Sequence, residues 1–303
     1  MNVLVTGGSG FIGRNIVKIL KEEGDTVVTL DVKDKNSIAD YHIICDVRNR
    51  QMVEKALSGI DYVFHMAAVT SPPEFENPIG DGYDVNVLGT YNILAASHAN
   101  KVKRVVFASS SSIYGSTSVA TSEEILPGKY SNFYPLTKRI NEMTARIFLD
   151  YGVEAVALRY FNTYGVGENS KGPYSSVIWK FIDSVRKREQ PMIYGDGKQR
   201  RDFIYIRDTA RASILAMKKG KPGQVYNVGT GISTDFNTIF QIVSEEMKYD
   251  GGAKYVPNPL KSYQYFTQAD ISKASKELEF KPEYDILKGV REMIQSPLHS
   301  SSK

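Results

Sequence analysis

The segment NVLVTGGSGFIG, residues 2–13, constrains the fold of this chain more than any other stretch. It begins with a β-branched run, stops at glycines, and continues into residues whose apolar side chains recur at helical spacing. Gly10 and Gly13 complete two overlapping patterns, G-x-G-x-x-G from Gly8 and G-x-x-G-x-x-G from Gly7. A strand that turns through such glycines into a helix presents free N–H groups to a pyrophosphate. We therefore expect a dinucleotide site at this turn.

The next predicted strand ends at Asp31. A carboxylate at this place in a βαβ unit can accept hydrogen bonds from the adenosine ribose, and it repels a 2′-phosphate. Asp31 therefore favours NAD over NADP, whereas Lys33 close by acts in the opposite direction. Further positions suit the same cofactor because they follow later strands or begin a helix beside them: Asp46, Val47, Ala67, Ala68 and Asn86.

Strands and helices alternate over the first 165 residues, and each predicted strand is a nearly continuous apolar run. This pattern predicts a parallel sheet covered by helices on both faces, a doubly wound α/β (Rossmann) fold. The expected strands cover residues 2–6, 26–31, 42–47, 61–68, 104–112 and 153–160, and the expected helices cover residues 12–23, 52–60, 84–100 and 135–151.

The regular alternation of strands and helices stops after residue 165, where the expected loops are longer and contain aromatic residues. This change predicts a smaller substrate-binding lobe made of residues 166–202 and 232–303. Residues 203–217 and 225–231 are expected to return to the main sheet. The NAD-binding domain would then comprise residues 1–165, rejoined by about 203–231.

The composition excludes several classes of protein. The net charge is only +4, with no clustered basic stripe, so we expect no nucleic-acid partner. A single cysteine, Cys45, permits no intrachain disulfide, and the four histidines lack the spacing of metal ligands. No apolar run approaches the length of a membrane span, and the first residues read as a strand rather than a signal peptide. We expect a cytoplasmic protein without a membrane partner.

Tyr134 and Lys138 stand four residues apart at the start of a predicted helix, so they share one face of it. In a doubly wound fold, Ser109 to Ser112 end the fifth strand and face the same crevice. A hydroxyl, a phenol and an ammonium can then converge on a nicotinamide. We expect Lys138, together with the positively charged oxidised nicotinamide, to lower the pKa of Tyr134 and make it a base.

The motifs, taken in order, resemble those of an extended short-chain dehydrogenase/reductase in the NAD-dependent nucleotide-sugar epimerase branch. They span nearly the whole chain: TGGSGFIG (6–13), Asp31, CDVR (45–48), FHMAA (64–68), NVLGT (86–90), SSSSIYG (109–115), YPLTK (134–138), RYFNTYG (159–165), RRDFIYIRD (200–208) and YNVGTG (226–231).

The resemblance implies a role for each matching residue. Tyr134 and Lys138 would be catalytic with Ser110, for which Ser111 is the alternative. The implied cofactor-binding residues also include Gly7, Gly10, Phe11, Ile12, Gly13, Ser109 and Phe161. The implied substrate-binding residues are Ser110, Ser111, Asn162, Val177, Arg201, Lys261 and Tyr263. Arg201 would clamp the diphosphate of a nucleotide sugar, with Arg200 as the other candidate.

Two relatives compete as models for the activity. UDP-glucose 4-epimerases oxidise C4 to a ketone and return the hydride to the other face; this is the activity we favour. That family carries an arginine near the late "AD" motif, whereas residues 258–270 here contain none, and Lys261 would take its place. ADP-heptose 6-epimerases are similar over residues 167–177 and 263–272, and in them a second catalytic lysine matches Lys171.

Two further expectations follow from the family. Its members commonly pair through the helices expected over residues 84–100 and 135–151, so the resemblance implies a homodimer. The same fold also supports non-catalytic NAD-binding sensors. The presence of Ser110, Tyr134 and Lys138 argues against that alternative.

Overall fold

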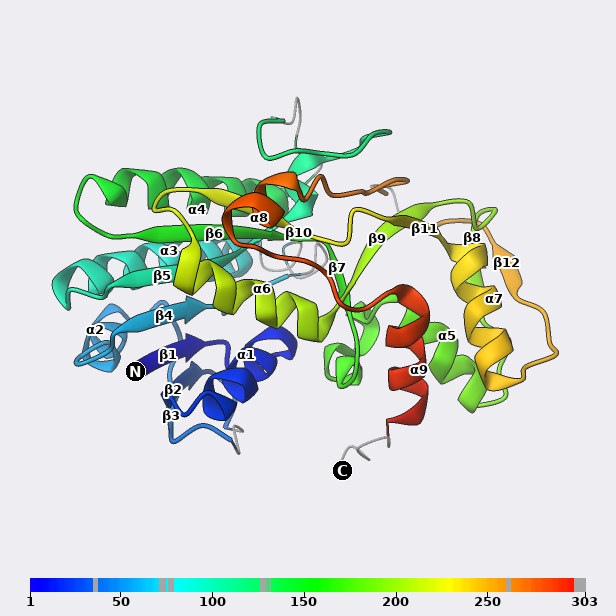
Figure 1. The fold of residues 1–303 in the computed structure, drawn as a ribbon, viewed down its shortest axis with the longest axis horizontal. Helices are drawn as coiled ribbons and strands as arrows, with labels where there is room; N and C mark the ends of the chain where they lie inside the picture. Colours follow the sequence, from blue (N-terminus) through cyan, green and yellow to red (C-terminus); the bar gives the residue numbers. More distant parts are fainter. Residues whose placement is uncertain are drawn as a thin grey trace.

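The computed structural model describes residues 1–34, 38–70, 75, 79–125, 130, 132–259 and 263–296. Its centre is a sheet of seven strands in the order β10-β6-β5-β4-β1-β2-β3, in which every neighbouring pair is parallel (Figure 1). The strands are β1 (Asn2–Thr6), β2 (Thr26–Asp31), β3 (Tyr41–Ile44), β4 (Tyr62–His65), β5 (Arg104–Ser110), β6 (Ala155–Tyr160) and β10 (Val225–Val228). The chain runs outward in both directions from β1, which confirms the doubly wound Rossmann arrangement.

Helices cover both faces of this sheet and bury its apolar side chains. One core contains residues of α1 (Phe11–Glu22) and α6 (Ile206–Lys219), which pack together, and of α8 (Ser272–Glu277). The other contains residues of α2 (Arg50–Ala56), α3 (Ile79–Ala99) and α4 (Phe133–Leu149). Because all strands are parallel, their carboxyl ends meet at one edge, where a doubly wound sheet binds its ligand.

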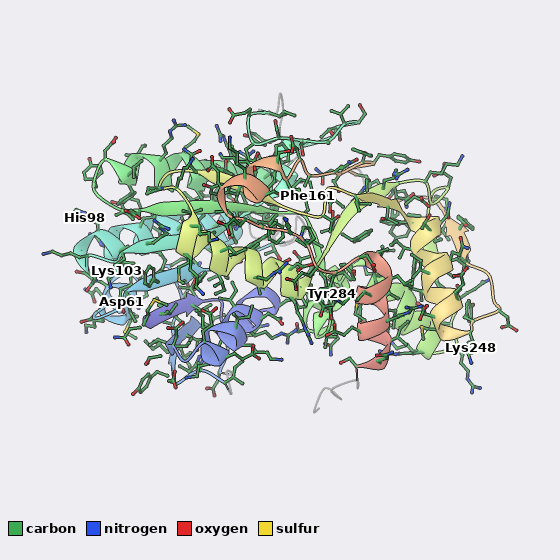
Figure 2. All side chains as sticks on the ribbon, viewed as in Figure 1. Asp61, His98, Lys103, Phe161, Lys248 and Tyr284 are labelled. Atoms are coloured by element: carbon green, nitrogen blue, oxygen red, sulfur yellow. The ribbon has the colours of Figure 1, made fainter. Side chains whose placement is uncertain are left out.

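The C-terminal elements gather around a third core beside this edge (Figure 1). A three-stranded sheet has the order β11-β9-β7, and a second sheet pairs β12 with β8. The elements are β7 (Asn162–Tyr164), the 3-10 segment η3 (Glu168–Tyr174), α5 (Val177–Arg186), β8 (Met192–Tyr194), β9 (Arg200–Tyr205), β11 (Ser233–Asp235), α7 (Phe236–Met247), β12 (Lys254–Val256) and α9 (Ile286–Gln295). Phe161 lies between β6 and β7, where the main sheet meets these elements (Figure 2).

One expectation about the sheet was wrong. Residues 203–217 do not all return to the main sheet, since β9 pairs with β7 and β11 instead. The cause is that β7 begins only two residues after β6 ends and leaves the main sheet, which gives β9 a separate partner. The helical part, α6, does pack on the main sheet, and β10 joins it next to β6.

Three strands also end earlier than expected, β3 at Ile44, β4 at His65 and β5 at Ser110. The residues that follow them leave the ladder at the carboxyl edge, close to the expected cofactor site. Within the part of the chain that the structure describes, no helix is both long and apolar enough to cross a membrane.

Candidate active site

In the turn between β1 and α1 the backbone packs closely against itself and against the backbone of the loop after β4. Gly7 has a φ of +66°, and a Cβ on it would lie 2.6 Å from the amide nitrogen of Ala67. A Cβ on Gly13 would overlap the carbonyl oxygen of Gly7. Gly10 is the N-cap of α1 and provides no capping side chain, which leaves the first N–H groups of Phe11 and its neighbours to an anion. This cradle fits the pyrophosphate of NAD.

Asp31 lies beside the glycine turn, at the end of β2. Its side chain is 8% exposed, and its two carboxylate oxygens accept hydrogen bonds from the backbone N–H groups of Ser9 and Lys33, each at 3.0 Å. These bonds fix the carboxylate at the place where the sequence predicts the adenosine ribose. The side chain of Lys33 is exposed, and it is the backbone of this residue that contacts Asp31.

Other expected cofactor positions line the same edge. The N–H of Ala67 donates to Thr6 Oγ1 at 3.2 Å, and Ala68 follows it in the loop after β4. Asn86 is buried on α3, and its amide exchanges hydrogen bonds with the backbone of Val69 at 2.8 and 3.0 Å. Asn86 therefore fixes the loop that carries the two alanines.

Asp46 and Val47 follow β3. Asp46 Oδ2 lies 2.8 Å from an Nη of Arg48, and the hydrogen bonds from Arg48 hold the pKa of that carboxyl below its usual range. Val47 is buried, and its carbonyl oxygen accepts a hydrogen bond from Asn92 on α3. Both residues are thus held at the carboxyl edge, one strand beyond Asp31.

Tyr134 and Lys138 occupy one face of α4, as their spacing predicts. Asn132 is the N-cap of this helix and accepts a hydrogen bond from the N–H of Tyr134 at 3.0 Å. The phenol of Tyr134 is hydrogen-bonded to the side chain of Ser110 at the end of β5. Lys138 is 3% exposed, and its Nζ donates to the carbonyl oxygen of Ala108 at 3.0 Å. The structure therefore brings all three expected catalytic groups together.

The electrostatics of these groups differ from the expectation. Burial raises the pKa of Tyr134, and the hydrogen bond with Ser110 acts against that rise. The expectation that Lys138 lowers the pKa of Tyr134 was wrong for this structure, because the ammonium group donates to Ala108 and itself loses solvent. Burial lowers the pKa of Lys138 to about 8.

His65, at the end of β4, is a site residue that sequence reasoning missed. Its ring lies between two hydroxyl groups, with Nδ1 2.7 Å from Thr6 Oγ1 and Nε2 3.1 Å from Thr90 Oγ1. Burial, together with the positive charge of Lys138, lowers the pKa of His65 to about 3. His65 is therefore neutral near pH 7. The sequence signal for it is its place at the end of a strand whose carboxyl end faces the expected cofactor site.

A buried ion pair lies beside Ser109, the neighbour in sequence of the expected catalytic Ser110. The hydroxyl of Ser109, an expected cofactor-binding residue, donates to Glu142 at 2.6 Å. Glu142 in turn pairs with Arg159 of β6 at 2.8 Å, and both side chains are at most 2% exposed. Although burial raises it, hydrogen bonds led by the one from Arg159 bring the pKa of Glu142 below its usual value. Glu142 stands four residues after Lys138, a spacing that sequence reasoning did not use.

Arg201 is buried in β9 and has an unusual environment for a guanidinium. Its side chain lies over the ring of Tyr263, with Cζ 4.9 Å from the centroid, and an Nη donates to the carbonyl oxygen of Arg200 at 2.8 Å. No carboxylate of the described residues forms an ion pair with it, and burial lowers its pKa. Arg200 is exposed and donates to Ser233. Of the two arginines, Arg201 is the one that needs an anion.

The remaining expected substrate residues lie at different places. Asn162 begins β7, and its Oδ1 accepts a hydrogen bond from Thr267 at 3.2 Å. Phe161 is buried against Tyr114, with ring centroids 6.2 Å apart. Ser111 is buried in the segment after β5, and Val177 is the first residue of α5. Lys261 lies outside the described residues.

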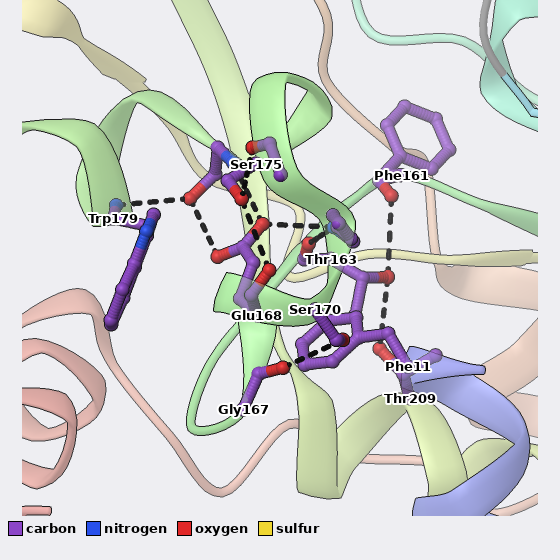
Figure 3. A network of polar contacts seen from close by, with 12 residues as sticks. Phe11, Phe161, Thr163, Gly167, Glu168, Ser170, Ser175, Trp179 and Thr209 are labelled. Carbon is purple, nitrogen blue, oxygen red and sulfur yellow. Dashed lines mark hydrogen bonds and ion pairs between the residues drawn. The ribbon is translucent and has the colours of Figure 1, made fainter. Parts of the chain in front are cut away.

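Lys171 points inward from η3. Its Nζ lies 2.8 Å from an oxygen of Glu168, donates to the carbonyl oxygen of Thr163 at 3.2 Å, and lies 4.5 Å from the ring centroid of Phe11. These contacts belong to a polar network that joins η3 to its neighbours (Figure 3). Lys171 is therefore neither an exposed loop lysine nor a free amine.

Known proteins share both the sequence and this architecture. The sequence model of the NAD dependent epimerase/dehydratase family matches residues 3–229. The chain belongs to this family. It is an NAD-dependent enzyme, which makes the non-catalytic sensor the weaker alternative, and the resemblance to nucleotide-sugar epimerases is confirmed.

Two curated relatives match almost the whole chain. The "Putative UDP-glucose 4-epimerase" of Methanocaldococcus jannaschii is 36% identical over 302 residues, covering 96% of this chain and 97% of that protein. The ADP-L-glycero-D-manno-heptose-6-epimerase of Alkalilimnicola ehrlichii is 32% identical over 319 residues and covers 97% of both chains. Both activities that the sequence suggested are thus represented among the relatives.

Solved structures confirm the fold. A UDP-glucose 4-epimerase of Thermotoga maritima with UDP-glucose has a TM-score of 0.91 at 31% identity, with 97% of each chain covered. A UDP-N-acetylglucosamine 4-epimerase of Methanobrevibacter ruminantium in complex with UDP-N-acetylmuramic acid has a TM-score of 0.90 at 33% identity, covering 97% of this chain and 96% of that chain.

Proposed function

We propose that this enzyme inverts C4 of a UDP-hexose, with UDP-glucose and UDP-galactose as the first pair to test. The observation that carries the proposal is the hydrogen bond between Tyr134 and Ser110, formed at the carboxyl end of β5 with Lys138 behind it. This edge also holds the glycine turn, so a sugar carbon can lie between the phenol and the cofactor. The names of two similar proteins, one of 36% identity and one with a TM-score of 0.91, support the same reaction.

Tyr134 is the residue proposed to move the proton of the C4 hydroxyl. When bound, NAD supplies the hydride acceptor and donor, and its oxidised ring adds a positive charge near the phenol. Burial in the described structure keeps Tyr134 protonated, so the charge of the oxidised ring is what would favour its phenolate, and Lys138 Nζ lies 5.8 Å from the centroid of the phenol ring. Ser110 would hold the same hydroxyl through its own hydrogen bond. Loss of the hydride from C4 and of the proton from O4 would give a 4-keto sugar. After this sugar rotates in the site, the hydride would return to the opposite face of C4 and Tyr134 would return the proton to O4.

Arg201 is proposed to bind the diphosphate. A buried guanidinium without a carboxylate partner among the described residues is costly unless an anion completes it. Its planar fork can donate two hydrogen bonds to phosphate oxygens, and Tyr263 lies against it as a stacking surface. Asn162 and Val177 remain proposed substrate contacts. The division into an NAD-binding domain (1–165, rejoined by about 203–231) and a substrate lobe is proposed with the same argument.

The enzyme is also proposed to form a homodimer through α3 and α4. These helices pack side by side and expose large apolar residues on their outer faces. The exposed residues are Leu88, Tyr91, Met143 and Ile147, of which Ile147 is 60% exposed. Large apolar residues exposed on two neighbouring helices are the kind of surface that an interface would cover.

ADP-heptose 6-epimerase activity is the second candidate, and the relative of 32% identity is the observation that favours it. In this candidate Lys171 would serve as a second proton-transfer group beside Tyr134. The ion pair of Lys171 with Glu168 weighs against that role.

Incubation of the protein with NAD and UDP-galactose, followed by proton NMR, tests the proposal. Appearance of UDP-glucose that is absent with Tyr134→Phe supports it. UDP-N-acetylglucosamine, UDP-glucuronate and the ADP-heptose offered in parallel identify the substrate. Conversion of the heptose alone would replace the C4 proposal by the second candidate.

A further inference from the structure

The carboxylate of Glu168 is the centre of a buried network in η3. Its side chain is fully buried. One oxygen lies 2.8 Å from Lys171 Nζ and accepts the N–H of Ser176 at 2.8 Å, while the other accepts the hydroxyl of Ser176 at 2.8 Å (Figure 3). Ser176 is the N-cap of α5. A buried carboxylate is tolerated only when it is paired and hydrogen-bonded, so Glu168 depends on these partners.

Lys171 carries the network on to the cofactor side. Its Nζ lies over the ring of Phe11, the first residue of α1 after the glycine turn, and donates to Thr163 in β7. The ammonium thus has a carboxylate, a carbonyl oxygen and an aromatic face as partners. An amine held in this way is a fixed cation with no lone pair directed to a substrate.

A second side chain makes the same connection independently. Arg14, one turn into α1, donates to the carbonyl oxygen of Gly167 and to the hydroxyl of Ser170. Its guanidinium also lies 5.6 Å from the ring centroid of Phe11. The glycine-turn end of α1 and the η3 segment are therefore joined through two cations that share one aromatic ring.

We propose that Lys171 is a positioning residue that holds Phe11 and the glycine turn in the NAD-binding geometry, and that it transfers no proton to the substrate. Glu168 fixes Lys171 and anchors the same assembly to α5. The absence of proton transfer by Lys171 rests on the proposed function. The positioning of the glycine turn by Lys171 rests only on the NAD site.

The substitution Lys171→Met removes the cation, and the carboxylate of Glu168 keeps only the two hydrogen bonds from Ser176. Phe11 loses its cation–π partner, and the turn loses one of its two links to η3. We expect NAD to bind about tenfold more weakly, which corresponds to about 1.4 kcal/mol. Lys171→Arg keeps a cation that can pair with Glu168 and stack on Phe11, so NAD affinity should stay within about threefold of the parent.

The decisive experiment measures NAD affinity by calorimetry on nucleotide-free protein, and UDP-galactose turnover at saturating NAD, for both variants. Lys187→Met is the matched control. Lys187 also forms an ion pair with a carboxylate less than one and a half helical turns away, since its Nζ lies 2.7 Å from Asp183 at i,i+4 spacing. This pair lies at the end of α5, and its lysine is exposed. We expect the control to bind NAD as the parent does.

Weaker NAD binding by Lys171→Met, with affinity and turnover restored by Lys171→Arg, supports the positioning role. Unchanged NAD affinity in Lys171→Met would refute it. Loss of turnover in both variants at saturating NAD, with affinity intact, would also refute it and assign proton transfer to Lys171. If the parent converts no sugar, the proposed function fails, whereas the NAD measurements still decide whether Lys171 positions the turn.

Discussion

Lys138 should be a residue that reduces the stability of this protein while serving its chemistry. Burial lowers its pKa from 10.5 to about 8, so at pH 7 the folded protein holds a charged ammonium in a place that disfavours charge. Each pKa unit is worth about 1.4 kcal/mol, so this burial lowers the free energy of unfolding by about 3 kcal/mol at pH 7. Replacement by methionine removes that cost but also the hydrogen bond to Ala108, worth about 1 kcal/mol. Lys138→Met should therefore gain about 2 kcal/mol at pH 7.

The pH dependence distinguishes this explanation from improved packing. Between pH 8 and 10.5 the unfolded chain binds the proton of Lys138 and the folded chain does not, so the parent gains stability as pH rises through this window. The advantage of Lys138→Met should therefore shrink over the same range. Urea unfolding of both proteins at pH 7 and pH 10 measures it, with Lys18→Met as an exposed-lysine control. A variant that is less stable than the parent at pH 7, or an advantage independent of pH, would refute the reasoning.

Three other predictions address single groups. The pKa of His65 is about 3 in the folded protein and 6.5 in its ordinary state, so on acidification the unfolded chain binds this proton first. The free energy of unfolding should therefore fall by up to about 1.4 kcal/mol per pH unit as the pH drops below 6.5. His65→Gln should lack this part of the acid destabilisation in urea titrations. Arg201→Met should weaken UDP binding about ten- to hundredfold and leave NAD affinity unchanged in calorimetry, and equal weakening of both would count against a diphosphate clamp. Ile147→Glu should convert the proposed dimer into a monomer in light scattering, whereas a monomeric parent would exclude that interface.

The predictions that succeeded rest on local signals. The glycine turn, its strand and its helix are contiguous in sequence, and the steric reason for Gly7 and Gly13 is the same in the pattern and in the structure. The spacing of Tyr134 and Lys138 places them on one face of a helix wherever that helix packs. Asn132 adds a local N-cap, so the start of α4 depends little on distant residues.

The predictions that failed depend on distant residues. The apolar run in β9 reads as a strand but does not indicate which sheet it joins, and it pairs with β7 and β11. The pKa of Tyr134 depends on how deeply α4 packs, which spacing does not report. The pairing of Glu142 with Arg159 and of Lys171 with Phe11 joins residues far apart in sequence or on different elements. Without a structure, such a lysine reads equally well as a base or a loop residue.

The central claim is that the sugar is oxidised at C4 and reduced again at the same carbon with Tyr134 as the proton-transfer group. UDP-galactose deuterated at C4, incubated with the protein and NAD in ordinary water, tests it most directly. We expect UDP-glucose that retains deuterium at C4, formed by the parent and not by Tyr134→Phe. UDP-glucose that has lost the label to solvent, or an undiminished reaction in Tyr134→Phe, would contradict it.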